Sequence, residues 1–304
     1  MAPSLRRLAL ALCLAAATGS AAGQALTVCM AEDNPPLSYR AQGQDRGLDV
    51  RVAQAVADEL GRPLKVVFFE SKYEHDSTLS HEVNALLSSG VCDLASGFAL
   101  MASDLGPPSR PTARVPDYPG AKRPPQRPWV PLGTLVPSRP YHAMAMALVV
   151  RDASRTDATL MNPGDARIGA VSGTMAGTVV SMYRNGKLRP QVVSLAQNED
   201  ALEQLEAGRI DATLVTLDRF DAWRLAHPAS GLRRAAYTHP LRINMGFVAR
   251  SDAPQALGAA DRVIGRALAS GELKRWSEQN GSTWIEPAEP AVSLAIGLAD
   301  LLRE

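Results

Sequence analysis

Apolar and polar positions along this chain form a helix-to-strand pattern that occurs twice. The stretch 84–98, NALLSSGVCDLASGF, ends an amphipathic helix, continues through Gly90 and enters a short apolar run. The stretch 205–212 repeats this order, with Gly208 between the helix and the strand. A glycine here suits the left-handed end of a helix, and the apolar run after it is typical of a buried strand. The pattern predicts two α/β halves of similar design, with a chance recurrence of a common junction as the alternative.

The same periodicities predict the remaining elements. Apolar runs and alternation indicate strands, whereas apolar positions three or four apart indicate helices. Strands are predicted at 26–30, 64–69, 94–98, 143–150, 165–171, 191–195, 210–217 and 241–249. Helices are predicted at 47–60, 82–88, 172–184, after a cap at Asn198, at 252–280 and at 291–302. Strands that alternate with helices predict an α/β fold.

The stretch 106–140 breaks this pattern, because it holds half of the chain's 22 prolines together with several arginines and lysines. Prolines lack the backbone N–H donor and fix φ, which excludes a helix or a central strand through this stretch. We expect an irregular, extended surface excursion. It is either a loop that docks a partner or a tolerated insertion, and the sequence leaves both open.

The first residues predict export. Arg6 and Arg7 precede an apolar run and then small residues, which is typical of a secretory signal peptide over 1–25, cleaved after Ala22 or Ala25. An uncleaved membrane anchor is the alternative, although the run is short for a membrane span. A bacterial protein with this leader is expected in the periplasm. The whole chain has a formal net charge of +1, which argues against nucleic acid or an anionic membrane surface as the main partner.

Two cysteines remain after removal of the signal peptide, Cys29 and Cys92. An even pair in an exported chain predicts a disulfide, and two buried free thiols are the alternative.

The chemistry of the chain points to binding rather than catalysis. Polar residues follow the first strand, and Ser172-Gly173-Thr174 starts a helix whose free N–H groups suit a polar ligand, or are simply capped by Ser172 or Thr174. The polar stretch 70–82, with Tyr73, His75 and His81, is interpreted as a solvated loop. The chain has no Ser-His-Asp order, HExxH or phosphate loop, and its five histidines lack metal-ligand spacing. We therefore predict no enzyme, metal or cofactor, although Glu70, Asp33 or Asp218 are the carboxylates that a dehydratase on this scaffold would use.

Several short motifs, taken in order, resemble those of the bacterial periplasmic solute-binding proteins of the amino-acid type, family 3. They are 34–39, the helix start at 47–50, the junction 87–98, 138–141, 171–174 and 208–212. The resemblance implies a two-lobed type II fold with a central mixed sheet in each lobe and a hinge of two crossover segments. It implies lobe 1 at 26–142 plus 245–285, including the proline-rich insertion, and lobe 2 at 143–244. Residues 286–304 are expected to end in an amphipathic helix.

The resemblance also implies a set of ligand-binding positions. They are Asp33, Asn34, Tyr39, Gly97, Phe98, Ala99, Gly173, Thr174, Met175, Thr216 and Asp218. The chain departs from the family where charge is needed: Leu105 stands in place of the carboxylate-binding arginine, and Thr216 in place of the amine-binding aspartate, with Asp218 close by. A zwitterionic amino acid would find no charged partner for either its carboxylate or its ammonium group, so the ligand is expected to be a different small molecule.

Two functions follow from this resemblance. The first is a non-catalytic receptor that closes on its ligand and presents the closed form to the membrane permease of an ABC-type transporter. The second comes from Val28-Cys29 and Gly90-Val91-Cys92-Asp93, which resemble the solute-binding-type proteins found with periplasmic quinoprotein (PQQ-dependent) alcohol dehydrogenases. That resemblance implies an accessory protein that binds a periplasmic dehydrogenase, through the insertion and the C-terminal helix.

Overall fold

The computed structural model describes residues 24–71, 78–123 and 126–303. The predicted signal peptide, apart from its last two residues, lies outside this range, as do Tyr73 and His75. Within the described part of the chain, no helix combines the length and the apolar character needed to cross a membrane.

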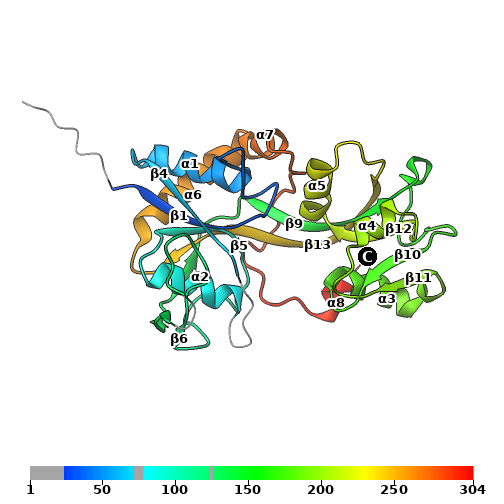
Figure 1. Ribbon diagram of the computed structural model, residues 1–304, viewed down its shortest axis with the longest axis horizontal. Coiled ribbons are helices and arrows are strands. Elements are labelled where there is room, and N and C mark those ends of the chain that lie inside the picture. Colours follow the sequence, from blue (N-terminus) through cyan, green and yellow to red (C-terminus); the bar gives the residue numbers. More distant parts are fainter. Residues whose placement is uncertain (1–23, 72–77, 124–125, 304) are drawn as a thin grey trace, which may run out of the picture.

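One mixed sheet of nine strands runs through the molecule (Figure 1). Its order is β11-β10-β12-β9-β13-β5-β1-β4, and β8 pairs with β13 beside this path. The strands are β1 (Leu26–Ala31), β4 (Leu64–Phe69), β5 (Leu94–Ala99), β8 (Leu135–Pro137), β9 (His142–Val150), β10 (Ile168–Val171), β11 (Val192–Leu195), β12 (Ala212–Thr216) and β13 (Arg233–Arg250). Parallel strands form both outer parts of the sheet, and the antiparallel pair β9 and β13 joins them. The predicted α/β class and mixed sheet are confirmed.

The hinge strand β13 is longer than predicted. The sequence pattern begins a strand at 241, whereas the structure begins it at Arg233. Residues 233–240 lack clean alternation, and pairing with β9 holds them extended, from Arg233 opposite Val150 to Met245 opposite His142. The register shifts twice along this pair, which is why the local pattern hides the strand.

Helices cover both faces of both ends of the sheet (Figure 1). At one end α1, α6 and α7 share a core cluster with β1, and α2 packs with a second cluster on the other face. At the other end α3 covers one face, and α4 and α5 cover the opposite one. The helices are α1 (Leu48–Glu59), α2 (Leu79–Ser88), α3 (Met175–Gly186), α4 (Ala201–Glu206), α5 (Leu217–Ala226), α6 (Pro254–Ala269), α7 (Glu272–Gln279) and α8 (Leu298–Leu301). Short elements complete the chain: β2 (Tyr39–Ala41), β3 (Gln44–Arg46), β6 (Thr112–Ala113), β7 (Val130–Pro131), and the 3-10 turns Ala153–Arg155 and Arg189–Gln191.

Both predicted helix-to-strand junctions are confirmed. Gly90 follows α2 with φ 74° and Gly208 follows α4 with φ 72°, so each glycine adopts the left-handed conformation. Two boundaries differ from the prediction. The structure starts α2 earlier, because Thr78 accepts a hydrogen bond from the N–H of His81. The cap of α4 is Asp200 rather than Asn198, because the Asp200 carboxylate accepts the Leu202 N–H.

The predicted disulfide joins Cys29 and Cys92, whose Cα atoms lie 5.8 Å apart. Cys29 lies within β1, and Cys92 lies just before its parallel neighbour β5. Both side chains are buried. The alternative of two free thiols does not hold in this structure.

The proline-rich stretch 106–140 is only partly the surface excursion that was predicted. Val115, Val130 and Leu135 are buried in the cluster around α2. Arg127 is buried as well, donates to the Val115 carbonyl at 3.2 Å and forms an ion pair with Asp117. Prolines prevented a helix here, as expected, but apolar side chains between them still anchor the stretch to the core.

The predicted final helix at 291–302 is wrong in extent. The helix α8 is confined to Leu298–Leu301, and the residues before it form bends and irregular backbone rather than helix. Their backbone groups bond to β13 and to the segment after β5 instead of to one another. Tertiary contacts thus override a helical pattern in the sequence.

The partition of the chain into lobe 1 (26–142 plus 245–285) and lobe 2 (143–244) stays a prediction. We use these two names for the two ends of the molecule, with β9 and β13 between them.

Candidate functional site

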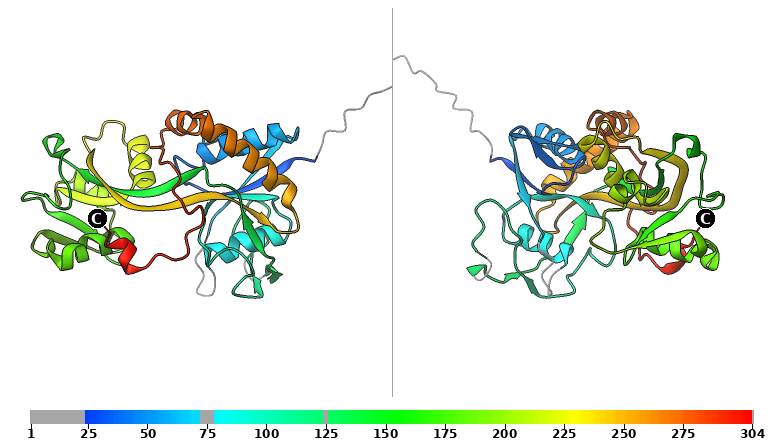
Figure 2. Two further views of the ribbon diagram at one scale, coloured as in Figure 1. Left: turned by 180° about the vertical axis from the view of Figure 1, so that it is seen from behind. Right: turned by 45° about the vertical axis from the view of Figure 1, so that its right-hand side comes forward.

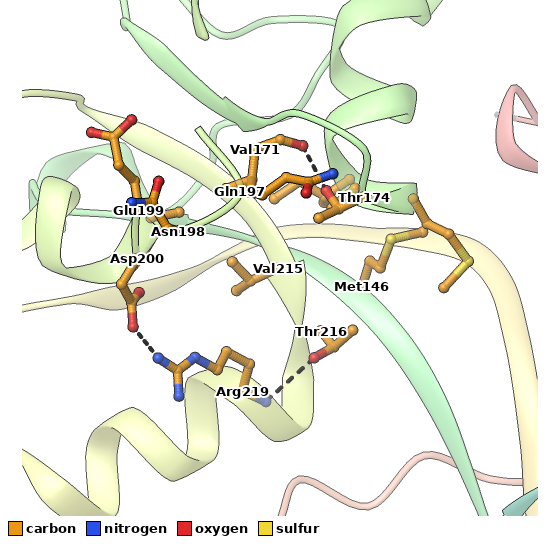
Figure 3. A pocket seen from close by; sticks show the side chains of 14 residues that line it. Met146, Val171, Thr174, Gln197, Asn198, Glu199, Asp200, Val215, Thr216 and Arg219 are labelled. Carbon is orange, nitrogen blue, oxygen red and sulfur yellow. Dashed lines mark hydrogen bonds and ion pairs between the residues drawn. The ribbon is translucent and has the colours of Figure 1, made fainter. Parts of the chain in front are cut away.

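A pocket lies in lobe 2 where the parallel strands β10, β11 and β12 end (Figure 3). It has a volume of about 440 Å³. Its lining residues come from β9, the ends of β10 and β12, the loop after β11 and the starts of α3, α4 and α5: Met146, Val171, Thr174, Met175, Ala176, Gln197, Asn198, Glu199, Asp200, Ala201, Leu214, Val215, Thr216 and Arg219. Open α/β sheets bind ligands at the carboxyl ends of their strands, where helices leave in opposite directions. The helices α3 and α4 leave this edge of the sheet toward opposite faces, so the pocket lies where such sheets bind their ligands.

The helix α3 is capped by Thr174. Its hydroxyl oxygen accepts the Gly177 N–H at 3.0 Å, and the hydroxyl donates to the Val171 carbonyl. Ser172 plays no part in the cap, and its hydroxyl lies 3.3 Å from that of Ser194. The first N–H groups of a helix lack partners within the helix, and Met175 and Ala176 at the start of α3 line the pocket, so this helix start suits a polar ligand atom.

Replacing the cap tests this assignment. We expect Thr174→Ala to lower the free energy of unfolding by about 1 kcal/mol, because the Gly177 N–H loses its acceptor. Ser172→Ala is the matched control and should change stability by less than about 0.5 kcal/mol. Urea unfolding of both variants measures the difference, and equal losses would contradict the assignment of the cap.

The charged side chains that line the pocket already have partners within the protein. Arg219 forms an ion pair with Asp200, which also caps α4 (Figure 3). The Glu199 carboxylate accepts the Ala196 N–H at 2.7 Å. The guanidinium of Arg219 is therefore paired with a carboxylate of the protein itself. A ligand carboxylate would find little electrostatic support here.

The predicted lobe 2 residues fall into two groups. Thr174, Met175 and Thr216 line the pocket, and Gly173 lies beside the pocket residue Gln197, whose amide occupies the space that a Cβ would need. Asp218 is not among the lining residues. Its carboxylate lies 3.3 Å from Nε2 of the buried His142 on β9, so it faces the hinge.

The predicted lobe 1 residues lie at the ends of β1 and β5, apart from this pocket. Asp33 and Asn34 form the turn after β1, and Tyr39 begins β2. Ala99 ends β5 opposite Met245. The side chain of Phe98 is buried in the lobe 1 core. None of these residues lines the pocket in lobe 2, and their role in binding stays a prediction.

Beside them, Asp49 at the start of α1 forms a buried polar cluster. Its carboxylate accepts hydrogen bonds from the Tyr141 hydroxyl at 2.8 Å and the Ser96 hydroxyl at 2.9 Å. The Gly97 N–H donates to the Tyr141 oxygen, and a Cβ on Gly97 would press against the Asp49 carboxylate. Burial raises the pKa of Asp49 from 3.8 to about 6, although both hydroxyls oppose this shift. Packing against Asp49 thus accounts for the glycine at position 97.

The position expected to hold a carboxylate-binding arginine is apolar in the fold as well. Leu105 packs against the lobe 1 core cluster around α2. The carboxylates named for a dehydratase, Glu70, Asp33 and Asp218, lie on three separate segments. Among the described residues, no group of three or more His, Cys, Asp or Glu side chains is placed to hold a metal ion.

Sequence reasoning missed most of the polar pocket residues, namely Gln197, Glu199, Asp200 and Arg219. One signal was available: the polar run 196–200 directly follows the strand 191–195, as 172–174 follows its neighbour. Because carboxyl ends of adjacent parallel strands share one edge, the two runs had to meet. Arg219 gave no such signal, since its place depends on how α5 leaves β12.

Comparison with known proteins shows the fold. No protein-family model matches the chain, and no curated protein matches its sequence. The second substrate-binding domain of a putative amino acid ABC transporter from Streptococcus pneumoniae is 12% identical, with a TM-score of 0.60, over 84% of this chain and 99% of that one. The chain has the type II periplasmic binding fold.

Two further structures share the type II periplasmic binding fold. Substrate-binding domain 2 of GlnP from Lactococcus lactis, in an open conformation, is 14% identical with a TM-score of 0.59, over 84% of this chain and 95% of that one. The unliganded, open L-cystine solute receptor of Neisseria gonorrhoeae is 20% identical with a TM-score of 0.56, over 86% of this chain and 95% of that one. At these identities the likeness establishes architecture and not a ligand.

Proposed function

We propose that this protein is a non-catalytic, periplasmic solute-binding protein that delivers a small polar molecule without a free carboxylate to an ABC-type permease. The pocket at the carboxyl ends of β10, β11 and β12 is the observation that carries the proposal. Its size suits a small ligand, and proteins of the same fold are described as ABC transporter substrate-binding domains.

The groups around the pocket support this ligand class. Gln197 and Asn198 offer amide groups, while Met146 and Val215 offer apolar contact. These groups suit hydroxyl, ether or amide functions on a compact carbon skeleton. A ligand carboxylate would compete with Asp200 for Arg219. Leu105 in lobe 1 supplies no cation either.

A thermal-shift screen of the mature protein tests the proposal. We expect stabilisation by an uncharged polyol, amide or alcohol and none by free amino acids, and a ligand at 100 times its Kd should add about 2.7 kcal/mol. Gln197→Ala should abolish the shift, and Gln54→Ala, on the exposed face of α1, should leave it unchanged. Micromolar binding of glutamine, arginine or histidine would contradict the ligand class, and no shift with any compound would contradict the receptor function.

The second candidate is an accessory protein of a periplasmic PQQ-dependent dehydrogenase. The bridge between Cys29 and Cys92 favours it, because that branch is the one whose cysteine positions the chain resembles. The insertion supports this candidate as well. It is anchored to the core, yet Trp129 within it is 54% exposed and is available for contact with a partner protein. Co-purification of a dehydrogenase subunit from the native periplasm, lost in Trp129→Ala, would favour this candidate.

A further inference from the structure

The C-terminal segment 286–303, called the tail below, runs from lobe 1 along the hinge to lobe 2. After α7 it passes the hinge strands and ends at α8 beside α3 (Figure 2, red). It is thus a third connection between the two ends of the molecule, in addition to β9 and β13.

Asn244 on β13 holds the first part of the tail. Its side chain is 2% exposed. The Nδ2 group donates to the carbonyl oxygens of Ala288 at 2.6 Å, Ala291 at 3.1 Å and Pro290 at 3.2 Å. The Oδ1 atom accepts the Ala288 N–H at 2.9 Å. Every one of these partners is a backbone group, so the asparagine recognises peptide backbone rather than a particular side chain.

The next part of the tail pairs like a strand with the residues that follow β5. The Ser293 N–H donates to the Leu100 carbonyl at 2.9 Å, and the Ala102 N–H donates to the Ser293 carbonyl at 2.8 Å. Val292 packs against the lobe 1 core beside this bridge. The tail therefore covers the carboxyl end of β5, which belongs to the edge of lobe 1 where ligand residues were predicted.

The end of the tail is anchored in lobe 2. Leu301 packs against the core cluster that α3 covers, and its carbonyl lies 3.1 Å from Nε2 of the buried His239. Between the two anchors only residues 294–297 are left, and Leu294 is 81% exposed. When fully extended, the chain from Ser293 to Leu298 spans at most about 18 Å.

We propose that Asn244 and the backbone of 100–102 form a binding site for an extended peptide, which the tail fills in cis to strap lobe 1 to lobe 2. Recognition is by main-chain hydrogen bonds, as in the addition of a strand to a sheet. Because the free span is short, a change in the angle between the lobes that exceeds it requires release of one anchor. This inference does not depend on the identity of the ligand or on the proposed function.

Hydrogen exchange in the full mature chain tests the site. Asn244→Asp keeps the acceptor for the Ala288 N–H but places a carboxylate against three carbonyl oxygens. We expect at least tenfold faster exchange of the Ser293 and Ala102 amides, with the amides inside β5 unchanged. Asn162→Asp, at an exposed position, is the matched control and should leave all of these rates unchanged. Unchanged exchange at Ser293 in Asn244→Asp would overturn the site.

A second experiment tests the strap at the anchor in lobe 2, and it stays informative if Asn244→Asp fails to fold. Leu301→Asp should release α8 from the lobe 2 core while leaving the pairing of β9 with β13 in place. Spin labels on Asp58→Cys in lobe 1 and Arg189→Cys in lobe 2, both exposed, report the distance between the lobes. We expect a broader distance distribution in Leu301→Asp and no change in Leu294→Ala. An unchanged distribution in Leu301→Asp would overturn the strap.

Discussion

Reduction of the mature protein is expected to lower its free energy of unfolding by about 4 kcal/mol. The bond between Cys29 and Cys92 closes a loop with a sequence separation of 63 residues. A cross-link of this length removes conformational entropy from the unfolded chain, which is the source of the stabilisation in the chain-entropy model. Reduction removes no heavy atom from the protein, so the change reports mainly the loss of the cross-link. Urea unfolding with and without a reductant measures it.

The double variant Cys29→Ala with Cys92→Ala is the control for this experiment. Both sulfur atoms lie in buried positions, so the variant should also lose packing energy, but its unfolding curve should not respond to the reductant. Mass spectrometry of the alkylated chain identifies the bond directly. Two free thiols in the purified protein, or a wild-type curve that ignores the reductant, would contradict the prediction.

The stabilising contribution of the buried Asp49 carboxyl is expected to fall by about 2 kcal/mol between pH 4 and pH 6, out of about 3 kcal/mol in all. Burial raises its pKa from 3.8 to about 6 in the folded state. The folded protein then binds the proton more tightly than the unfolded chain, so its contribution is fully present below pH 4. That contribution is lost as the pH rises through 6. Each unit of pKa difference corresponds to about 1.4 kcal/mol.

Asp49→Asn isolates this contribution, because the amide keeps the shape of the side chain and cannot ionise. The difference in unfolding free energy between wild type and Asp49→Asn should change by about 2 kcal/mol over this window, in favour of the variant at the higher pH. Leu294→Ala, at an exposed position, changes no titratable group and should give a difference that is flat with pH. A flat difference for Asp49→Asn as well would contradict the assignment of the buried charge.

The sequence determined most of the local architecture. The apolar runs and periodicities placed nearly every strand and helix, and the glycines at 90 and 208 placed the two junctions. These features are local, since a helix end or a buried strand is specified by residues within a few positions of one another. The two cysteines could be paired from sequence because only two remained after the signal peptide.

Only the tertiary structure decided the rest. Asp200 and Arg219 form an ion pair at the wall of the pocket, so their charges offset each other. No spacing in the sequence indicates this pairing. The full length of β13 and the extended tail follow from partners far away along the chain, β9 for one and Asn244 for the other. Backbone groups take whichever hydrogen-bond partners the completed fold presents, so a segment with a helical pattern became a non-helical connection between the lobes.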